Sequence, residues 1–154
     1  MSQAQLTKVY LAGPCSSEHR TMMTNIAKTI RNIKGFDVYC PFELKIENAW
    51  DMTQEDWSKA VFDKDIAAIH DCDIFLMISL GRESTAGTNW EQGYAYALKK
   101  PTYVFQITPA KTSLMTFCGC NSFKNCDIEH IDDAITYALI NKIYYTGYCE
   151  TILT

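Results

Sequence analysis

The 154-residue sequence lacks the features by which several classes of protein are recognised. No apolar run approaches the roughly 18 residues that a membrane-spanning helix needs, so we expect no membrane partner. No signal peptide precedes the first strand-like segment, and we therefore expect a cytoplasmic protein. Positive charge is also in deficit, because the net charge is −4. A protein that holds a nucleic-acid backbone needs a basic surface, so we expect no nucleic-acid partner.

Two glycine-rich phosphate motifs are missing as well. Neither G-x-G-x-x-G nor G-x-x-x-x-G-K-[ST] occurs, so the signatures of dinucleotide-binding and P-loop proteins are absent. The seven cysteines are odd in number, and without a secretion signal we interpret them as reduced thiols. Cys118, Cys120, Cys126 and His130 follow a C-x-C-x5-C-x3-H pattern, whose first spacing is shorter than zinc sites use. We favour small side chains in a loop there and expect neither a metal nor a cofactor.

The sequence does contain a regular alternation of short apolar segments and amphipathic segments. Strands are predicted at residues 8–12, 36–40, 73–79 and 102–107, and helices at about 16–34, 54–70, 89–98 and 128–141. Residues 42–54 and 108–126 lack periodicity and are predicted to be irregular. This order favours one α/β domain over residues 1–154, in which helices cover both faces of a central parallel sheet.

Parallel strands with right-handed crossovers end along one edge of the sheet, where ligands bind. The first such turn, Gly13-Pro14-Cys15-Ser16-Ser17, can present amides and hydroxyls to an anion at a helix N-terminus. Cys15 raises a second interpretation, a reactive thiolate followed by Arg20 on the helix. Cysteine phosphatases place five residues between cysteine and arginine, and this chain has four, so we disfavour it.

One acid stands in the otherwise uncharged segment 87–95. A helix beginning near Asn89 would place Glu91 in its first turn, where the helix dipole favours the ionised carboxylate. Such a carboxylate can attack an anomeric carbon, and the alternative is an ordinary first-turn glutamate without a catalytic role. Asp65, near the buried side of the preceding helix, is a candidate general acid. Trp57 lies on a compatible face and either stacks a nucleobase or packs in the core.

Four motifs in this order and spacing resemble the nucleoside 2-deoxyribosyltransferase family. They are Tyr10-Leu11-Ala12-Gly13-Pro14, Asp65 with Ile69-x-x-x-Asp73, Gly87-Thr88-x-Trp90-Glu91-x-Gly93-x-Ala95, and Leu114-Met115. The resemblance implies a flavodoxin-like (Rossmann-like) three-layer fold, and a homodimer or higher homo-oligomer whose neighbouring subunit completes the active site. It implies that Glu91 is the nucleophile, that Asp65 assists the leaving base and that Tyr10 orients Glu91. It also places Trp57 at the base pocket.

The departures from the family pattern concern the sugar 5′ position. The transferases carry an aspartate six residues before the nucleophile and an asparagine before the Leu-Met pair, whereas this chain has Thr85 and Ser113. Small hydroxyl residues at both positions resemble the related nucleoside 5′-monophosphate N-glycosidases, because a hydroxyl can donate to a phosphate. Further expected substrate contacts come from five other residues: Gly13, Ser16, Ser17, Arg20 and Gly87. Met115 completes the substrate site that the resemblance implies.

Three functions follow as hypotheses. In the first, Glu91 attacks C1′ of a nucleoside 5′-monophosphate, Asp65 assists departure of the base, and water resolves the ester to (deoxy)ribose 5-phosphate. The alternative is a transferase that exchanges bases between unphosphorylated deoxynucleosides. The third is a nucleotide sensor in which Glu91 is structural. The residues name neither the base nor the 2′ substituent, and they assign no role to Cys118, Cys120 and Cys126.

Overall fold

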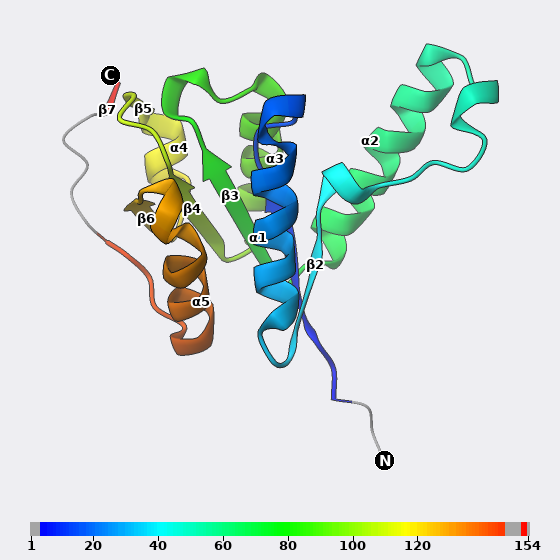
Figure 1. Cartoon of the computed structure of the whole chain (residues 1–154). Coiled ribbons are helices and arrows are strands. Elements are labelled where there is room, and N and C mark those ends of the chain that lie inside the picture. Colours follow the sequence, from blue (N-terminus) through cyan, green and yellow to red (C-terminus); the bar gives the residue numbers. More distant parts are fainter. Residues whose placement is uncertain (1–3, 147–151, 154) are drawn as a thin grey trace.

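Five parallel strands form the centre of the molecule. The computed structural model describes residues 4–146 and 152–153 (Figure 1). The sheet runs in the order β2-β1-β3-β4-β6. Its strands are β1 (Thr7–Ala12), β2 (Phe36–Tyr39), β3 (Ile74–Ser79), β4 (Thr102–Gln106) and β6 (Ser122–Asn125). This is the flavodoxin-like strand order, so the predicted fold class is confirmed.

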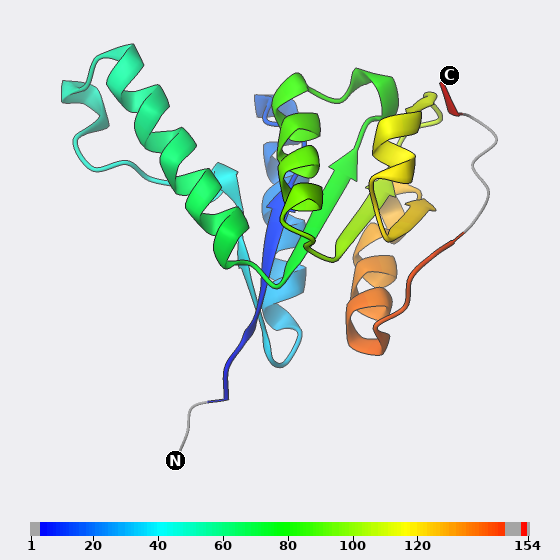
Figure 2. The same cartoon turned by 180° about the vertical axis from the view of Figure 1, so that it is seen from behind.

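Helices cover both faces of this sheet, as Figures 1 and 2 show. On one face lie α1 (Arg20–Asn32) and α5 (Ile131–Asn141), which contact each other. On the other lie α2 (Gln54–Asp71), α3 (Ala86–Ala97) and the short α4 (Leu114–Cys118). No helix in the described part of the chain is long and apolar enough to cross a membrane.

Side-chain alternation along the strands creates two separate cores. In β1, Val9 and Leu11 join the core beneath α1 and α5, while Tyr10 and Ala12 join the core on the opposite face. Residues 9–12 of the strand are buried on both faces, which explains why this part of the sequence is continuously apolar rather than alternating. Because the side-chain period of a strand is two, this register fixes Tyr10 on the face that carries α2 and α3.

The structure corrects two predictions made from the sequence. Residues 108–126 are not irregular, because they contain β5 (Thr112–Ser113), α4 and the edge strand β6. Within β6, Lys124 and Asn125 are polar and only Ser122 and Phe123 are buried, so the segment has no apolar run to reveal it. Short β5 pairs with β7 (Ile152–Leu153) in a second small sheet.

The second correction concerns where α3 begins. It starts at Ala86 rather than Asn89, and Thr85 is its N-cap. Thr85 Oγ1 accepts a hydrogen bond from the Thr88 amide at 3.4 Å. Glu91 therefore lies in the second turn of the helix, where the helix dipole is weaker than the prediction assumed.

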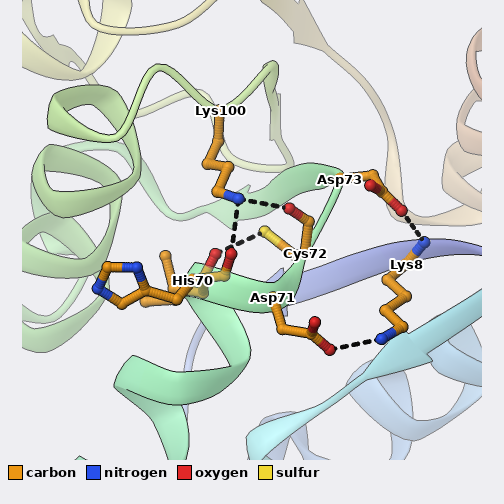
Figure 3. A network of polar contacts seen from close by, with 7 residues as sticks. Lys8, His70, Asp71, Cys72, Asp73 and Lys100 are labelled. Atoms are coloured by element: carbon orange, nitrogen blue, oxygen red, sulfur yellow. Dashed lines mark hydrogen bonds and ion pairs between the residues drawn. The ribbon is translucent and has the colours of Figure 1, made fainter.

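Helix α2 is fastened at its C-terminal end and projects from the sheet at its other end (Figure 1). Ile69 is its only fully buried residue. Figure 3 shows the fastening, in which Lys100 Nζ donates to the carbonyl oxygens of His70 at 2.7 Å and Cys72 at 2.8 Å. Lys8 Nζ pairs with Asp71 at 2.6 Å beside it. The half of α2 nearer its N-terminus therefore rests on few contacts with the rest of the chain.

Candidate active site

Glu91 and Tyr10 meet at the edge of the sheet where the strands end. Tyr10 is fully buried on β1, and Glu91 is half-buried on α3. Tyr10 Oη and Glu91 Oε2 are buried, and neither makes a hydrogen bond with any described residue. Neither atom is satisfied elsewhere among the described residues, so the Tyr10 hydroxyl is available to hold the Glu91 carboxylate.

The surroundings of Glu91 shift its acidity. Burial raises the pKa of Glu91 to about 7, the nearby Tyr10 hydroxyl opposes that rise, and the charge of Asp65 adds to it. Burial also raises the pKa of Asp65, against the effect of a hydrogen bond from Tyr39. Two carboxyls with raised pKa values in one site are typical of general acid and nucleophile pairs.

A stack of three aromatic rings on the sheet lies beside the carboxyl groups of Glu91 and Asp65. Tyr10 lies between Tyr39 and Phe75, with ring centroids 5.4 and 5.5 Å away and interplanar angles of 19° and 8°. The three residues face each other in register across β2, β1 and β3. Tyr39 Oη donates to Asp65 Oδ1 at 2.8 Å. The stack thus directs one tyrosine hydroxyl toward each carboxyl group.

Both carboxyls line one cavity of about 290 Å³ between α2 and α3. The other lining residues are mostly apolar: Phe62, Ile66, Ile69, Gly87 and Trp90. Of the predicted site residues, the structure brings Glu91, Asp65 and Gly87 together here. Mostly apolar walls with two convergent carboxyls suit a flat heterocycle that must be protonated as it leaves.

The aromatic walls of this cavity differ from the prediction. Phe62 and Trp90 line it, with ring centroids 5.7 Å apart. Trp57 does not line it, because it lies eight residues before Asp65, about 12 Å along α2 toward the projecting end. Two features of the sequence are consistent with this lining: Phe62 lies three residues before Asp65 on the same helix face, and Trp90 directly precedes Glu91.

The turn after β1 is tied to the start of α3 by hydroxyl groups. Thr88 Oγ1 donates to the Gly13 carbonyl oxygen at 3.0 Å, and Thr85 Oγ1 lies 2.9 Å from Thr88 Oγ1. Because each hydroxyl carries one proton, Thr85 donates to Thr88 in this arrangement. A Cβ at Gly13 would lie 2.6 Å from Met23 Cε, so a larger residue here would force the buried Met23 side chain to shift.

Three other predicted substrate contacts are exposed beside this turn. Ser16 Oγ lies 2.7 Å from His19 Nδ1, and Ser17 begins a short helical turn before α1. The Arg20 guanidinium lies 5.2 Å over the Phe42 ring. Among the ion pairs of the described residues none involves Arg20, so its N–H groups are free for an anion.

Comparison with known proteins identifies the family. Residues 9–138 match the family described as nucleoside 2-deoxyribosyltransferase. The chain belongs to the nucleoside 2-deoxyribosyltransferase family. Comparison with curated protein sequences gives no significant match.

Solved structures of this deoxyribosyltransferase fold resemble the chain over most of its length. The 2-deoxyribosyltransferase of Bacillus psychrosaccharolyticus is 25% identical, with a TM-score of 0.72, and covers 92% of this chain and 99% of its own. The CMP N-glycosidase BcmB of Clostridium botulinum is 18% identical, with a TM-score of 0.60, over 84% and 98%. A conserved protein of Enterococcus faecalis is 14% identical, with a TM-score of 0.57, over 90% and 99%.

The last two expected substrate contacts of this family member lie on the other face of α3. Ser113 and Met115 line a second cavity of about 400 Å³, together with Asn89, Gln92 and Tyr96. Glu91 does not line that cavity. Met115 is 75% exposed. Within a single copy of the chain, Ser113 and Met115 are therefore not brought to Glu91.

Cys15 lies near the carboxyl pair, but its thiol is not suited to act as a nucleophile. Burial and the charges of Glu91 and Asp65 raise the pKa of the Cys15 thiol, which opposes the thiolate that a cysteine nucleophile needs. Among residues 4–146 and 152–153, no three His, Cys, Asp or Glu side chains gather as a metal site would require. The C-x-C pattern at Cys118 and Cys120 forms no such group there.

Proposed function

We propose that this protein hydrolyses the N-glycosidic bond of a nucleoside 5′-monophosphate. Membership of the family makes N-glycosidic bonds of nucleosides or nucleotides its chemistry. The observation that carries the proposal is Glu91, whose carboxyl shares a mostly apolar cavity with Asp65 and whose buried Oε2 has no hydrogen-bond partner among the described residues. The cavity has the composition that a nucleobase requires, and the carboxyls have the roles that bond cleavage requires.

The proposed reaction has two displacements at C1′. The ionised Glu91 carboxylate forms a bond to C1′ as the C1′–N bond breaks, and the electron pair of that bond goes to the base nitrogen. Protonated Asp65 supplies the proton that this base takes up. Asp65, now ionised, accepts a proton from a water molecule that attacks C1′ and releases Glu91. The products are the free base and a sugar 5-phosphate with its configuration retained.

Thr85 supports a phosphorylated substrate. It caps a 12-residue helix whose first amides, at Ala86 and Gly87, have no carbonyl partner within the helix. An aspartate at this position would repel a phosphate, whereas the threonine leaves the positive end of α3 open to one. Arg20, which forms no ion pair with another described residue, lies beside the turn after β1 and adds a cation to the same side. Ser16 and Ser17 add hydroxyl donors.

A homo-oligomer would complete this site. Ser113 and Met115 face away from Glu91 in one copy, so we propose that a second copy supplies them. The projecting part of the chain around α2 exposes large apolar side chains that an assembly would cover: Trp50, Met52, Trp57 and Phe62. Gathered exposed apolar groups of this size mark interaction surfaces.

Base exchange between deoxynucleosides is the second candidate. The observation that favours it is the greater similarity to a 2-deoxyribosyltransferase than to the CMP N-glycosidase, in both identity and TM-score. In this reaction a second base, instead of water, attacks C1′ of the glycosyl ester. A binding protein without chemistry is the third candidate, but it leaves the paired carboxyls of raised pKa unexplained.

Product release from paired substrates separates these candidates. Each nucleoside 5′-monophosphate and its unphosphorylated nucleoside, in ribo and deoxyribo forms, is incubated with and without an acceptor base, and free base is quantified. We expect base release from the monophosphates alone, without an acceptor. Reaction of the nucleosides only when an acceptor is present would establish the transferase. Tight binding of a nucleotide without any base release would establish the binding protein.

A further inference from the structure

Asp65 lies on a helix that the rest of the chain holds loosely. The side chain of α2 that is fully buried, Ile69, follows Asp65 by one turn, and the polar ties of Figure 3 act at residues 70–73. Before Asp65 the helix is mostly exposed, out to its capped start at Thr53. Packing of the helix therefore does little to fix where the Asp65 carboxyl points, and a specific hydrogen bond has to do so.

That contact is the hydroxyl of Tyr39, the last residue of β2. Its Oη donates to Asp65 Oδ1 at 2.8 Å and joins residues 26 positions apart in the chain. The ring of Tyr39 is held by its stack on Tyr10, in register on the neighbouring strand. A ring fixed by the sheet thus positions a carboxyl on a helix that the sheet barely fixes.

We propose that Tyr39 is a positioning residue for the proposed function, on which this inference rests. By occupying Oδ1 of Asp65, its hydroxyl makes Oδ2 the oxygen that carries the proton to the leaving base. A neutral carboxyl has one O–H and one carbonyl oxygen, and a phenol donates best to the carbonyl oxygen. The proton then resides on the oxygen that Tyr39 leaves free. Tyr39 therefore holds Asp65, while Tyr10 lies beside Glu91.

The titratable groups around Asp65 define what loss of this hydroxyl would do. They are Tyr39 from β2, Tyr10 from β1, Glu91 from α3 and Cys15 from the turn after β1, and none of them is a cation. The Tyr39 hydrogen bond lowers the pKa of Asp65, so its removal raises that pKa. Asp65 and Glu91 titrate as a coupled pair, and tighter proton binding by one member moves no apparent pKa of the pair downward.

The test is Tyr39→Phe, which keeps the ring and its stack and removes only the hydroxyl. The matched control is Tyr103→Phe, a buried sheet tyrosine on β4 in the core of the opposite face. We expect kcat of Tyr39→Phe to fall about tenfold or more while KM changes little, because the acid is misplaced after binding. One limb of the pH profile moves up by about one unit, the worth of a hydrogen bond to a charged group, and neither limb moves down. Tyr103→Phe keeps the wild-type profile.

A second measurement reads Asp65 without substrate. Carboxyl-carbon NMR titration of the free protein should show a higher Asp65 pKa in Tyr39→Phe. Unchanged kcat and pH profile would overturn the role of Tyr39, even if the NMR pKa rises. A loss of activity that follows thermal stability with no pH shift would overturn it too. If the wild-type protein releases no base from any nucleotide or nucleoside, the proposed function fails. That outcome is distinct from the two results that would overturn the role of Tyr39.

Discussion

Replacing Glu91, whose Oε2 is buried, with glutamine should stabilise the protein, and the gain should depend on pH. The pKa of Glu91 is about 7 in the folded protein, against an ordinary value of 4.5. Below pH 4.5 the carboxyl is neutral in both states and costs nothing. Above pH 7 it is ionised in both, and the folded state bears the full cost of a buried charge. One pKa unit corresponds to about 1.4 kcal/mol, so this cost is about 3 kcal/mol.

The sign of this change in stability distinguishes a carboxylate that burial destabilises from one that stabilises the fold. A folded pKa raised above the unfolded value contributes stability at low pH that is lost as the pH rises through 4.5 to 7. Glu91→Gln cannot ionise and escapes that loss. We therefore expect the variant to gain up to about 3 kcal/mol in free energy of unfolding at pH 8, and close to nothing at pH 4.5.

Denaturant unfolding across this pH range measures the difference. Wild type and Glu91→Gln are unfolded at fixed protein concentration from pH 4.5 to 8, because assembly makes apparent stability depend on concentration. Glu129→Gln, a substitution of an exposed glutamate in the turn before α5, is the matched control and should show no such gain. A Glu91→Gln variant that is less stable than wild type at pH 8, or whose gain is equal at all pH values, would refute the reasoning.

Three further substitutions test other contacts. Lys100→Met removes the donor to the carbonyl oxygens at the end of α2, including that of His70. It should lower the free energy of unfolding by about 1–3 kcal/mol, and an unchanged unfolding midpoint would contradict this. Gly13→Ala places a Cβ 2.6 Å from the buried Met23 Cε and should cost about 1–3 kcal/mol in the same assay, and an unchanged unfolding midpoint would contradict this. Thr85→Asp keeps a side chain that can cap α3 but adds a negative charge. The kcat/KM for a monophosphate, divided by the kcat/KM for its nucleoside, should fall about tenfold or more. An unchanged ratio would place the phosphate elsewhere.

The parallel sheet could be predicted because buried strands on both faces are continuously apolar. β3 is the clearest example, with five of its six residues buried. The edge strand β6 could not be, because three of its four residues are polar and its pairing with β4 depends on the assembled sheet. The start of α3 was misplaced for a similar reason. Thr85 caps the helix through a local bond that periodicity does not report.

For the site, the sequence identified single residues better than it identified contacts. Glu91 and Asp65 were predicted, and the structure places both in one cavity. The interaction of Tyr39 with Asp65 was not predicted, because it requires strand register and helix placement together. Trp90 lines the cavity and Trp57 does not, although the sequence marks Trp90 only as part of a motif. Which residues share a cavity follows from tertiary packing, and a pattern along the chain reports it only in part.

A covalent glycosyl ester on Glu91 is the central claim, and mass spectrometry of acid-quenched protein tests it most directly. The protein is mixed with a nucleoside 5′-monophosphate that it cleaves, quenched during turnover and digested. We expect the peptide that contains Glu91 to carry the added mass of one pentosyl phosphate, and Glu91→Gln to carry none. Base release without any adduct on this peptide, or an adduct on another residue, would contradict the assignment of Glu91 as the nucleophile.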